Sequence, residues 1–455
     1  MLRGRRPRGI VALPGGVGHS SRYRFSVAHA LGVALQPGAT AMSTKGRRSA
    51  DRGEEGSLPA PAMHAAGKPR LRVLGTSVTL VEPIRAAAAQ ELGIELLFDI
   101  KDGVAAQQQA VMHPGDFDVY DQWFNSLDLV WSSRSVQAIE TARIKLWGEV
   151  NDLAKTGRLQ ADARMGRGSA PFRKLYVQAN GELGPRATPW ISMLPTVHNV
   201  DSFSYNTDVV PRGRPYDTES WGWLLDERWK GRVALVSDPA IGPMDAALAV
   251  QAAGLAAFEE IGNMTLREID ALIDVLIRKK RAGHFGGFWG APAESERLMA
   301  TGAVVMESMW SPAVTALRGK GLPIVEASPR EGYRAWHGGL CISAHADGRA
   351  RDAAYDYMNW WLSGWAGAVM ARQGYYISVP KRVKPHLSPE EWDFWYEGRV
   401  AEVDMRGPSG DVIARKGEAR NGGSYWRRVG NIAVWNSAMD EHNYLVRRWN
   451  ELLSA

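Results

Sequence analysis

The alternation of strand and helix patterns from Leu71 onward is the feature that most constrains how this chain can fold. Apolar runs typical of buried strands cover residues 71–75, 94–98 and 117–120, with helix-like stretches between them. Strands and helices that alternate at this spacing predict βαβ units around a parallel sheet. Because ligands bind such sheets at the carboxyl ends of the strands, the residues that follow the first and third runs are candidate contacts: Thr76, Ser77, Trp123 and Asn125.

The second half of the chain repeats this order. A strand pattern over 233–236 precedes an Ala-rich helix over 244–260 and a helix capped by Thr265, and a strand over 303–306 precedes a long helix over 349–373. The chain of 455 residues exceeds the ~250–300 residues at which a single core stops growing. We therefore expect two α/β lobes with a cleft between them.

The positive charge of the chain is concentrated at its start. Residues 1–70 hold 12 of the 55 Lys and Arg side chains and 3 of the 49 Asp and Glu, so residues 71–455 have a net charge of −3. We interpret this basic leader either as a targeting segment with a disordered tether or as the product of a mis-assigned start codon. The body lacks the basic aromatic face of a nucleic-acid binder and any run of ~20 apolar residues that could span a membrane.

The sequence lacks the signatures of common enzyme classes. It has no Gly-x-Ser-x-Gly elbow, no His-Glu-x-x-His, no phosphate-binding loop and only one cysteine, Cys341, in an apolar run typical of a core. We therefore expect no catalytic residue, no cofactor and no metal site.

Amphipathic aromatic residues are frequent in this sequence. It has 18 tryptophans and 13 tyrosines against 10 phenylalanines, and such rings suit an apolar surface that must also form hydrogen bonds. Tryptophans in helical patterns are expected to pack in the core. Those at strand ends or in Gly-rich loops are candidates for packing and for a ligand cleft alike: Trp123, Trp289, Trp310, Trp336 and Tyr375.

An ordered series of motifs resembles the bacterial extracellular solute-binding proteins of ABC importers, and within them the spermidine/putrescine-binding family. The segment Ser220-Trp221-Gly222-Trp223-Leu224-Leu225, followed by residues 228–238, is similar to the family's approach to a strand and an acidic turn. Further similar segments follow the family's order at residues 204–208, 300–310, 336–339 and 374–379. The similarity runs from about Leu71 to Arg399.

The resemblance implies an α/β fold of the periplasmic-binding-protein type II class, a two-lobed clamp with a mixed sheet in each lobe and hinge strands that cross the cleft. It assigns residues 71–200 and 311–345 to the first lobe, and residues 201–310 and 346–455, including a C-terminal extension, to the second. Both lobes must contact the ligand, because a ligand closes a clamp only by as much as it binds the closed form better. The implied contacts are Thr76, Ser77, Trp123, Asn125 and Trp336 from the first lobe, Asp238, Trp289 and Tyr375 from the second, and Trp310 near the hinge.

The charges depart from the family pattern. Polyamine binders pair the ammonium groups of the ligand with carboxylates, but here Asp238 is followed by Pro239-Ala240-Ile241-Gly242-Pro243 and Trp310 by Ser311-Pro312-Ala313-Val314. The ligand is therefore expected to be polyamine-like or else an aromatic, neutral or anionic compound, stacked between tryptophans and steered by Arg334.

The resemblance also implies a function and partners. The chain would be the periplasmic, monomeric binding component of an ABC importer, handing a small organic solute to permease and ATPase subunits, meeting the membrane only through the permease and binding no nucleic acid. The alternative is a cytoplasmic two-domain α/β enzyme or sensor acting on a small organic ligand. The weak export signal favours this alternative, and the missing catalytic signatures oppose it.

Overall fold

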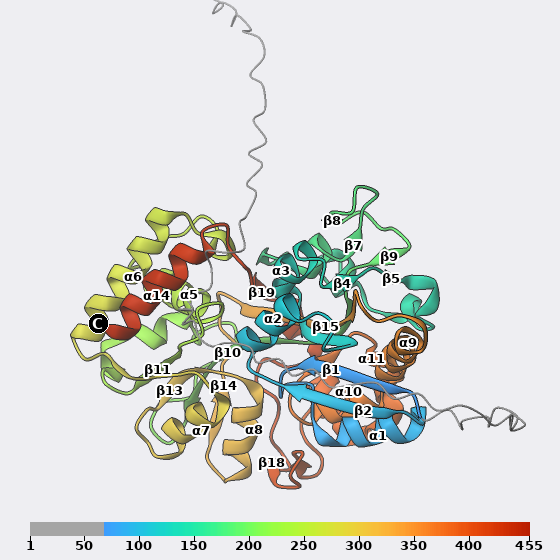
Figure 1. Cartoon of the computed structure of the whole chain (residues 1–455). Coiled ribbons are helices and arrows are strands. Elements are labelled where there is room, and N and C mark those ends of the chain that lie inside the picture. The colour runs from blue at the N-terminus through green and yellow to red at the C-terminus, as the bar shows by residue number, and fades with distance from the viewer. Residues whose placement is uncertain (1–67) are drawn as a thin grey trace, which may run out of the picture. The chain divides into compact units, whose positions relative to one another are not determined.

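The computed structural model describes residues 68–455, so the interpretation of the basic leader falls almost wholly outside the described residues. The strands and helices expected after Leu71 are present as β1 (Arg70–Gly75), α1 (Glu82–Leu92), β2 (Glu95–Ile100), α2 (Gly103–Met112) and β3 (Val119–Trp123) (Figure 1). β1 lies between β2 and β3 and runs parallel to both. Gly93 ends α1 with φ 65°, and the Asp102 side chain caps α2 by accepting a hydrogen bond from the Ala105 amide.

A second group of alternating elements follows from residue 233. It comprises β11 (Val233–Val236), α5 (Gly242–Ala252), α6 (Leu266–Arg281), β12 (Phe285–Trp289), α7 (Pro292–Ala300), β13 (Met306–Met309) and α8 (Ser311–Gly319). The expected capping box is present, since the Thr265 side chain accepts from the Glu268 amide while the Glu268 side chain accepts from the Thr265 amide. The Ala-rich helix is shorter than expected and is followed by Gly254, which has φ 69°.

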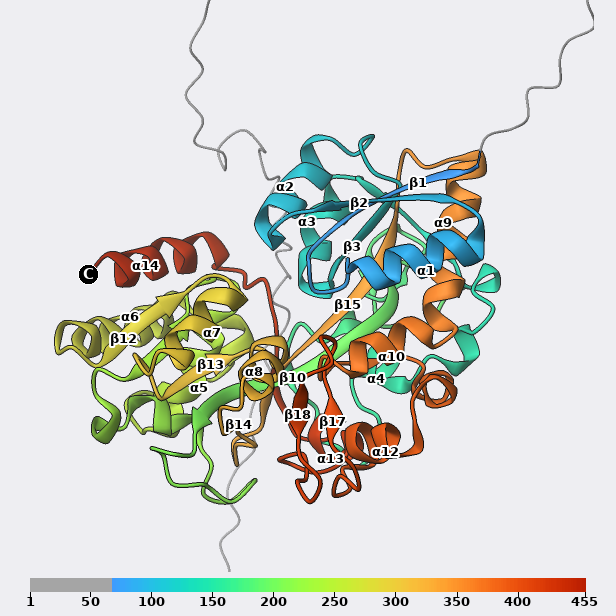
Figure 2. The ribbon, with the colours of Figure 1, turned by 90° about the horizontal axis from the view of Figure 1, so that it is seen from below.

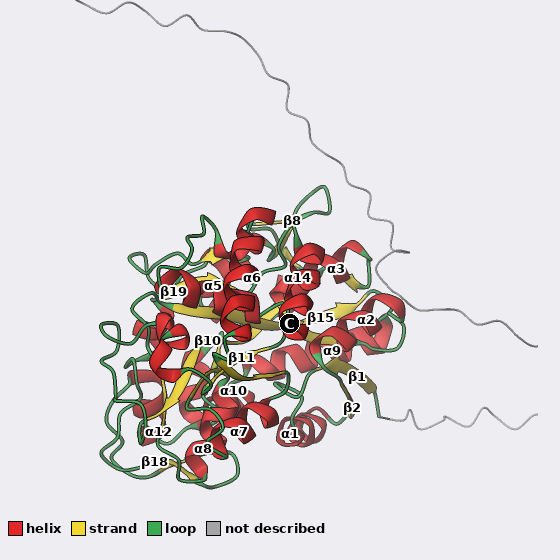
Figure 3. Ribbon diagram, turned by 90° about the vertical axis from the view of Figure 1, so that its left-hand side faces the viewer, coloured by secondary structure: helices red, strands yellow, loops and turns green. Residues whose placement is uncertain are grey.

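Two long strands connect these groups into one sheet. β10 (Leu194–Asn206) pairs with β15 (Tyr333–Ser343) along its first part and with β13 and β14 (Ile324–Glu326) along its last part. The main path of the sheet is β12-β11-β13-β10-β15-β3-β1-β2. Figure 2 shows β10 and β15 running from one group of elements to the other, as expected for strands that cross a cleft. Helices lie around the strands of both groups (Figure 3).

The buried apolar side chains form two main cores. One contains residues from 71–200 and 333–435, and the other contains residues from 203–327 and 433–452. We call the elements around these cores the first and second lobes. This packing corrects the expected assignment of residues 346–455, including Tyr375, to the second lobe. It also corrects part of the expected first lobe, since Val325 and Ala327 pack in the second core and α8 contacts α7. The helix α9 (Gly348–Leu362) contacts β1 and α1, and only the last part of the chain, including α14 (His442–Ser454) against α6, packs in the second lobe.

The long helix expected over 349–373 is broken. α9 ends at Leu362 and α10 covers Trp365–Ala371, with Gly364 between them at φ 111°. A side chain at this glycine would meet the carbonyl oxygen of Arg382 at 1.9 Å, so the chain can turn here only with glycine. Gly374, at φ 89°, follows α10 as a left-handed residue, as its position in the sequence indicated.

The remaining elements are short. Between β3 and β10 the chain forms α3 (Leu127–Ser132), β4 (Val136–Gln137), α4 (Asp152–Thr156), β6 (Arg167–Gly168) and a separate sheet of β5 (Ile139–Glu140), β7 (Tyr176–Val177), β8 (Leu183–Gly184) and β9 (Trp190–Ile191). After α10 come β16 (Tyr376–Ile377), α11 (Pro380–Val383), α12 (Pro389–Trp392), β17 (Met405–Arg406), β18 (Val412–Ala414), α13 (Tyr425–Val429) and β19 (Ile432–Trp435).

Candidate functional site

A small cavity lies beside the crossing strands, with walls from both lobes. It holds about 300 Å³ of space that protein atoms do not fill, part of which is open to solvent. Its walls are four aromatic residues, two apolar residues and three polar or charged ones: Trp123, Trp310, Trp336, Tyr375, Val78, Ile241, Asp201, Arg334 and Asn436. A ligand held here would touch side chains of both lobes, which is the requirement for a clamp.

The aromatic walls are fixed by contacts with one another. The rings of Trp336 and Tyr375 meet edge to face with centroids 5.4 Å apart. Trp310 precedes α8, and its ring meets that of Trp289 at 4.9 Å and 80°. Trp289 is fully buried at the end of β12 and donates from Nε1 to the Ser308 carbonyl (3.0 Å). Trp289 therefore holds Trp310 in place from behind and does not itself line the cavity.

A buried charged cluster forms the polar wall. Arg334 of β15 donates from Nε to Asp245 (2.6 Å), from one terminal nitrogen to Asn436 (3.1 Å) and from the other to Asp201 of β10 (3.4 Å). Asp201 also accepts from Trp336 Nε1 (2.8 Å) and from the Asn199 amide group (2.9 Å). All three guanidinium nitrogens are thus engaged within the protein. The role expected for Arg334, steering an anionic ligand, is therefore disfavoured.

Burial changes the protonation of this cluster. Burial raises the pKa of Asp201 to about 7, although the Arg334 guanidinium acts in the opposite direction. Burial likewise raises the pKa of Asp245, again against the effect of Arg334. Burial acts to lower the pKa of Arg334, but the two carboxylates outweigh it and raise that pKa. The cluster therefore gains negative charge as the pH rises through about 7, when Asp201 ionises.

The cavity brings together four of the nine residues singled out by sequence: Trp123, Trp310, Trp336 and Tyr375. The other five lie outside its walls. Ser77 is exposed and Thr76 is buried, both beside the lining residue Val78. Asn125 is half-buried in the turn after β3, Asp238 accepts from the Ala240 amide (2.7 Å) near the start of α5, and Trp289 supports Trp310. Burial raises the pKa of Asp238 as well.

Two polar lining residues were missed from the sequence. Asn436 follows β19 directly, so the rule that ligands meet the ends of strands would have indicated it. Asp201 lies within β10, where every residue except the last is buried. A carboxylate within a strand of buried residues could have indicated Asp201, because a buried carboxylate requires a partner.

Within residues 68–455, no group of three or more His, Cys, Asp or Glu side chains is arranged to hold a metal ion. No helix among these residues is long and apolar enough to cross a membrane.

A family model described as bacterial extracellular solute-binding protein matches residues 130–394, more than half of the chain. The comparison with curated proteins finds no match. Solved structures supply further similarities at low sequence identity.

The TpPotD lipoprotein of Treponema pallidum has a TM-score of 0.57 at 10% identity, covering 85% of this chain and 98% of that one. The spermidine/putrescine ABC transporter substrate-binding protein PotD of Streptococcus pneumoniae has a TM-score of 0.56 at 13% identity, covering 85% and 97%. The binding protein MotA of Agrobacterium tumefaciens, in complex with glucopine, has a TM-score of 0.52 at 12% identity, covering 84% and 99%. These likenesses concern the fold, and they confirm the expected two-lobed α/β clamp.

Proposed function

The chain belongs to the family of bacterial extracellular solute-binding proteins, as its motif series indicated, and we propose that its aromatic cavity captures a small organic solute for an ABC importer. The observation that carries this proposal is the convergence of Trp123, Trp336 and Tyr375 from the first lobe with Trp310 and Ile241 from the second. A solute between these side chains would bind the closed clamp better than the open one, and closure would mark the loaded protein for its permease.

We further propose that the solute has an apolar or flat body and one cationic group. The aromatic rings would pack against the body, and rings also attract a cation placed over their faces. The polar wall has two carboxylates for one guanidinium, and all nitrogens of Arg334 are already engaged. An amine beside Asp201 would stabilise the ionised carboxylate, whereas an anion there would oppose it.

We propose that the protein acts in the periplasm as a monomer, without enzymatic activity and without binding nucleic acid, and that it meets the membrane through the permease and its ATPase. Family membership supports an extracytoplasmic role in transport. Nothing in the described residues favours the alternative of a cytoplasmic enzyme.

Titration with a panel of solutes tests the proposal. The panel contains putrescine and spermidine, which the description of the Streptococcus pneumoniae relative names, and glucopine, which is bound to the Agrobacterium tumefaciens relative. It also contains amino-acid derivatives and aromatic acids. We expect a saturable change in tryptophan fluorescence and a higher Tm with at least one amine, because four aromatic side chains line the cavity. If only aromatic acids bind saturably, the proposal that the solute carries a cationic group is contradicted. If no compound of the panel binds, the proposal that the cavity captures a small organic solute is contradicted.

The variant Trp310→Ala tests whether the bound solute lies in this cavity. If the indole packs against the solute, we expect its loss to weaken binding by ~1–3 kcal/mol, about 5- to 150-fold in Kd. The matched control is Trp190→Ala, because the Trp190 ring is 43% exposed and lies outside the cavity. Calorimetric titration of both variants measures the effect. If the two variants bind the solute with equal affinity and Trp310→Ala is less stable, Trp310 packs within the protein and does not contact the solute.

A further inference from the structure

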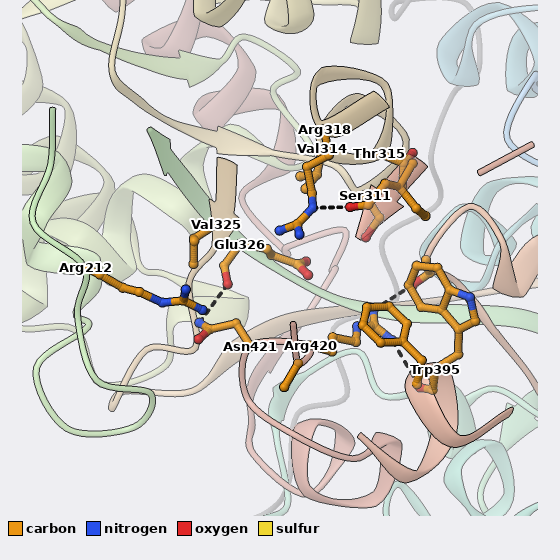
Figure 4. A pocket seen from close by; sticks show the side chains of 14 residues that line it. Arg212, Ser311, Val314, Thr315, Arg318, Val325, Glu326, Trp395, Arg420 and Asn421 are labelled. Atoms are coloured by element: carbon orange, nitrogen blue, oxygen red, sulfur yellow. Dashed lines mark hydrogen bonds between the residues drawn. The ribbon is translucent and has the colours of Figure 1, made fainter. Parts of the chain in front are cut away.

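A second pocket lies between the lobes and shares no lining residue with the aromatic cavity. It has about 580 Å³ of empty space. One side is formed by α8, β14 and Arg212 of the second lobe, and the other by Gly374, Phe394, Trp395, Ile413 and residues 419–421, whose buried members pack in the first core. Figure 4 shows Arg212, Arg318 and Arg420 reaching this pocket from three different segments. It is not part of the function proposed above.

The pocket carries more positive than negative charge. Arg318 is paired with Glu418, and the lining residue Glu326 is paired with the buried Arg428 (2.9 Å). Arg212 and Arg420 remain, and neither lies within salt-bridge distance of a carboxylate in the part of the chain that the structure describes. The lining therefore has an excess of two positive charges once these pairs are counted. Such an excess attracts an anion.

Arg420 is held by neutral oxygen atoms alone. It donates to the Tyr376 hydroxyl, to the Gly374 carbonyl (2.9 Å) and weakly to the Trp395 carbonyl (3.4 Å), and its guanidinium lies 4.8 Å and 5.0 Å from the ring centroids of Tyr376 and Trp395. Burial lowers the pKa of this guanidinium. A carboxylate in the pocket would give this cation the counter-charge that its surroundings lack.

The acidic residue of the lining does not offset this charge. Glu326 bonds Arg428 through Oε2, and its Oε1 is enclosed by protein, so it is closed to a ligand in the pocket. Figure 4 labels Glu326 together with Arg212 and Arg420 around the pocket. The rest of the wall is apolar and includes Val314, Phe394 and Trp395.

From these contacts we infer that the second pocket binds a small dicarboxylic acid. Its carboxylates meet Arg420 and Arg212, and its carbon chain packs on the apolar wall. Because the pocket has walls in both lobes, its occupant favours the same closed arrangement as the solute in the aromatic cavity, so each should strengthen the binding of the other.

Binding of L-malate to the full chain tests this inference, with malamide as a probe of the same length that carries no carboxylate. We expect saturable binding of malate by calorimetry, and binding of malamide about tenfold or more weaker because Arg212 and Arg420 lose their charged partners. The variant Arg212→Ala should weaken malate binding about tenfold at low salt. Arg212 is exposed, so its removal leaves the fold intact.

The control for charge is Arg415→Ala, because Arg415 is an exposed arginine that does not line this pocket. It should change the affinity for malate less than twofold. Arg420→Lys, which keeps the charge but loses the planar fork, should also weaken malate binding. Three outcomes would each overturn the inference: no malate binding at millimolar concentration, equal affinities for malate and malamide, or equal effects of the variants at Arg212 and Arg415. These outcomes are independent of the amine titration above.

Discussion

Replacing Arg334 with methionine is expected to lower the free energy of unfolding by about 3–5 kcal/mol, the range measured when one partner of a buried ion pair is removed. The side chains of Arg334, Asp201 and Asp245 are 1%, 2% and 1% exposed. Methionine fills much of the same volume but provides no charge. Two buried carboxylates would then lack their cation.

The loss of unfolding free energy in Arg334→Met should be larger at pH 8 than at pH 5. Burial already raises the pKa of Asp201 to about 7 and that of Asp245 above its ordinary value, and Arg334 opposes both shifts. Without Arg334 both pKa values rise further in the folded protein and stay near 4 in the unfolded chain. A raised folded-state pKa means that stability is lost as the pH rises from the unfolded to the folded value. The variant should therefore be closer to the wild type at pH 5 than at pH 8.

Urea unfolding followed by circular dichroism at both pH values measures this effect. The matched control is Arg214→Met, which removes an exposed arginine 2.6 Å from Asp217 and should cost at most about 1 kcal/mol. Adding Asp245→Asn to Arg334→Met should restore part of the loss, since it removes one of the unpaired charges. A variant at Arg334 no less stable than the one at Arg214 would contradict the assigned role of the cluster.

The sequence predicted where most strands and helices lie along the chain, but it did not predict which elements they pack against. The apolar runs and caps located β1, β2, β11 and α6 closely, because periodicity and capping are local properties. The same patterns do not say which core an apolar face meets. Residues of α9 have a buried face that would suit either lobe, and only the contacts with β1 and α1 place it in the first.

For the candidate site, too, the sequence indicated positions along the chain but not tertiary contacts. Trp123, Trp310, Trp336 and Tyr375, named from the rules for strand ends and Gly-rich loops, line the cavity, although Trp336 lies within the strand β15 and not in a loop. Their contact with a ligand stays a prediction. Those rules do not give the direction of a side chain, so Trp289 was named with Trp310 although it packs behind that ring.

The polar wall could not be predicted, because its members are far apart in the chain. Asp201 and Arg334 become neighbours only through the antiparallel pairing of β10 with β15. Asp245 joins them from α5. The missing acidic residues after Asp238 and Trp310 suggested a neutral or anionic ligand steered by Arg334, and the two carboxylate partners of Arg334 oppose that steering role.

The variant Glu307→Gln is expected to make the protein more stable at neutral and alkaline pH. Glu307 lies in β13 between Ser204 of β10 and Ala234 of β11, is fully buried, and has no hydrogen-bond partner for either carboxyl oxygen among the described residues. Burial raises its pKa from 4.5 to about 9, an effect that the nearby Ser295 hydroxyl only partly offsets. At pH 7 the carboxyl is therefore protonated in the folded protein and ionised in the unfolded chain.

This difference costs stability as the pH rises from about 4.5 towards 9, because the folded state holds a proton that the unfolded state has lost. At pH 7 the cost is on the order of 3 kcal/mol, because each pH unit above the pKa of the unfolded chain costs ~1.4 kcal/mol. Glutamine has nearly the same shape and no proton to lose. The variant should match the wild type near pH 5 and exceed it by several degrees in Tm at pH 8. The exposed Glu402, changed to Gln, provides the control and should leave the pH profile unchanged. Parallel profiles for Glu307→Gln and wild type would mean that Glu307 is already ionised in the folded protein, and that a cation or water reaches it inside the second lobe.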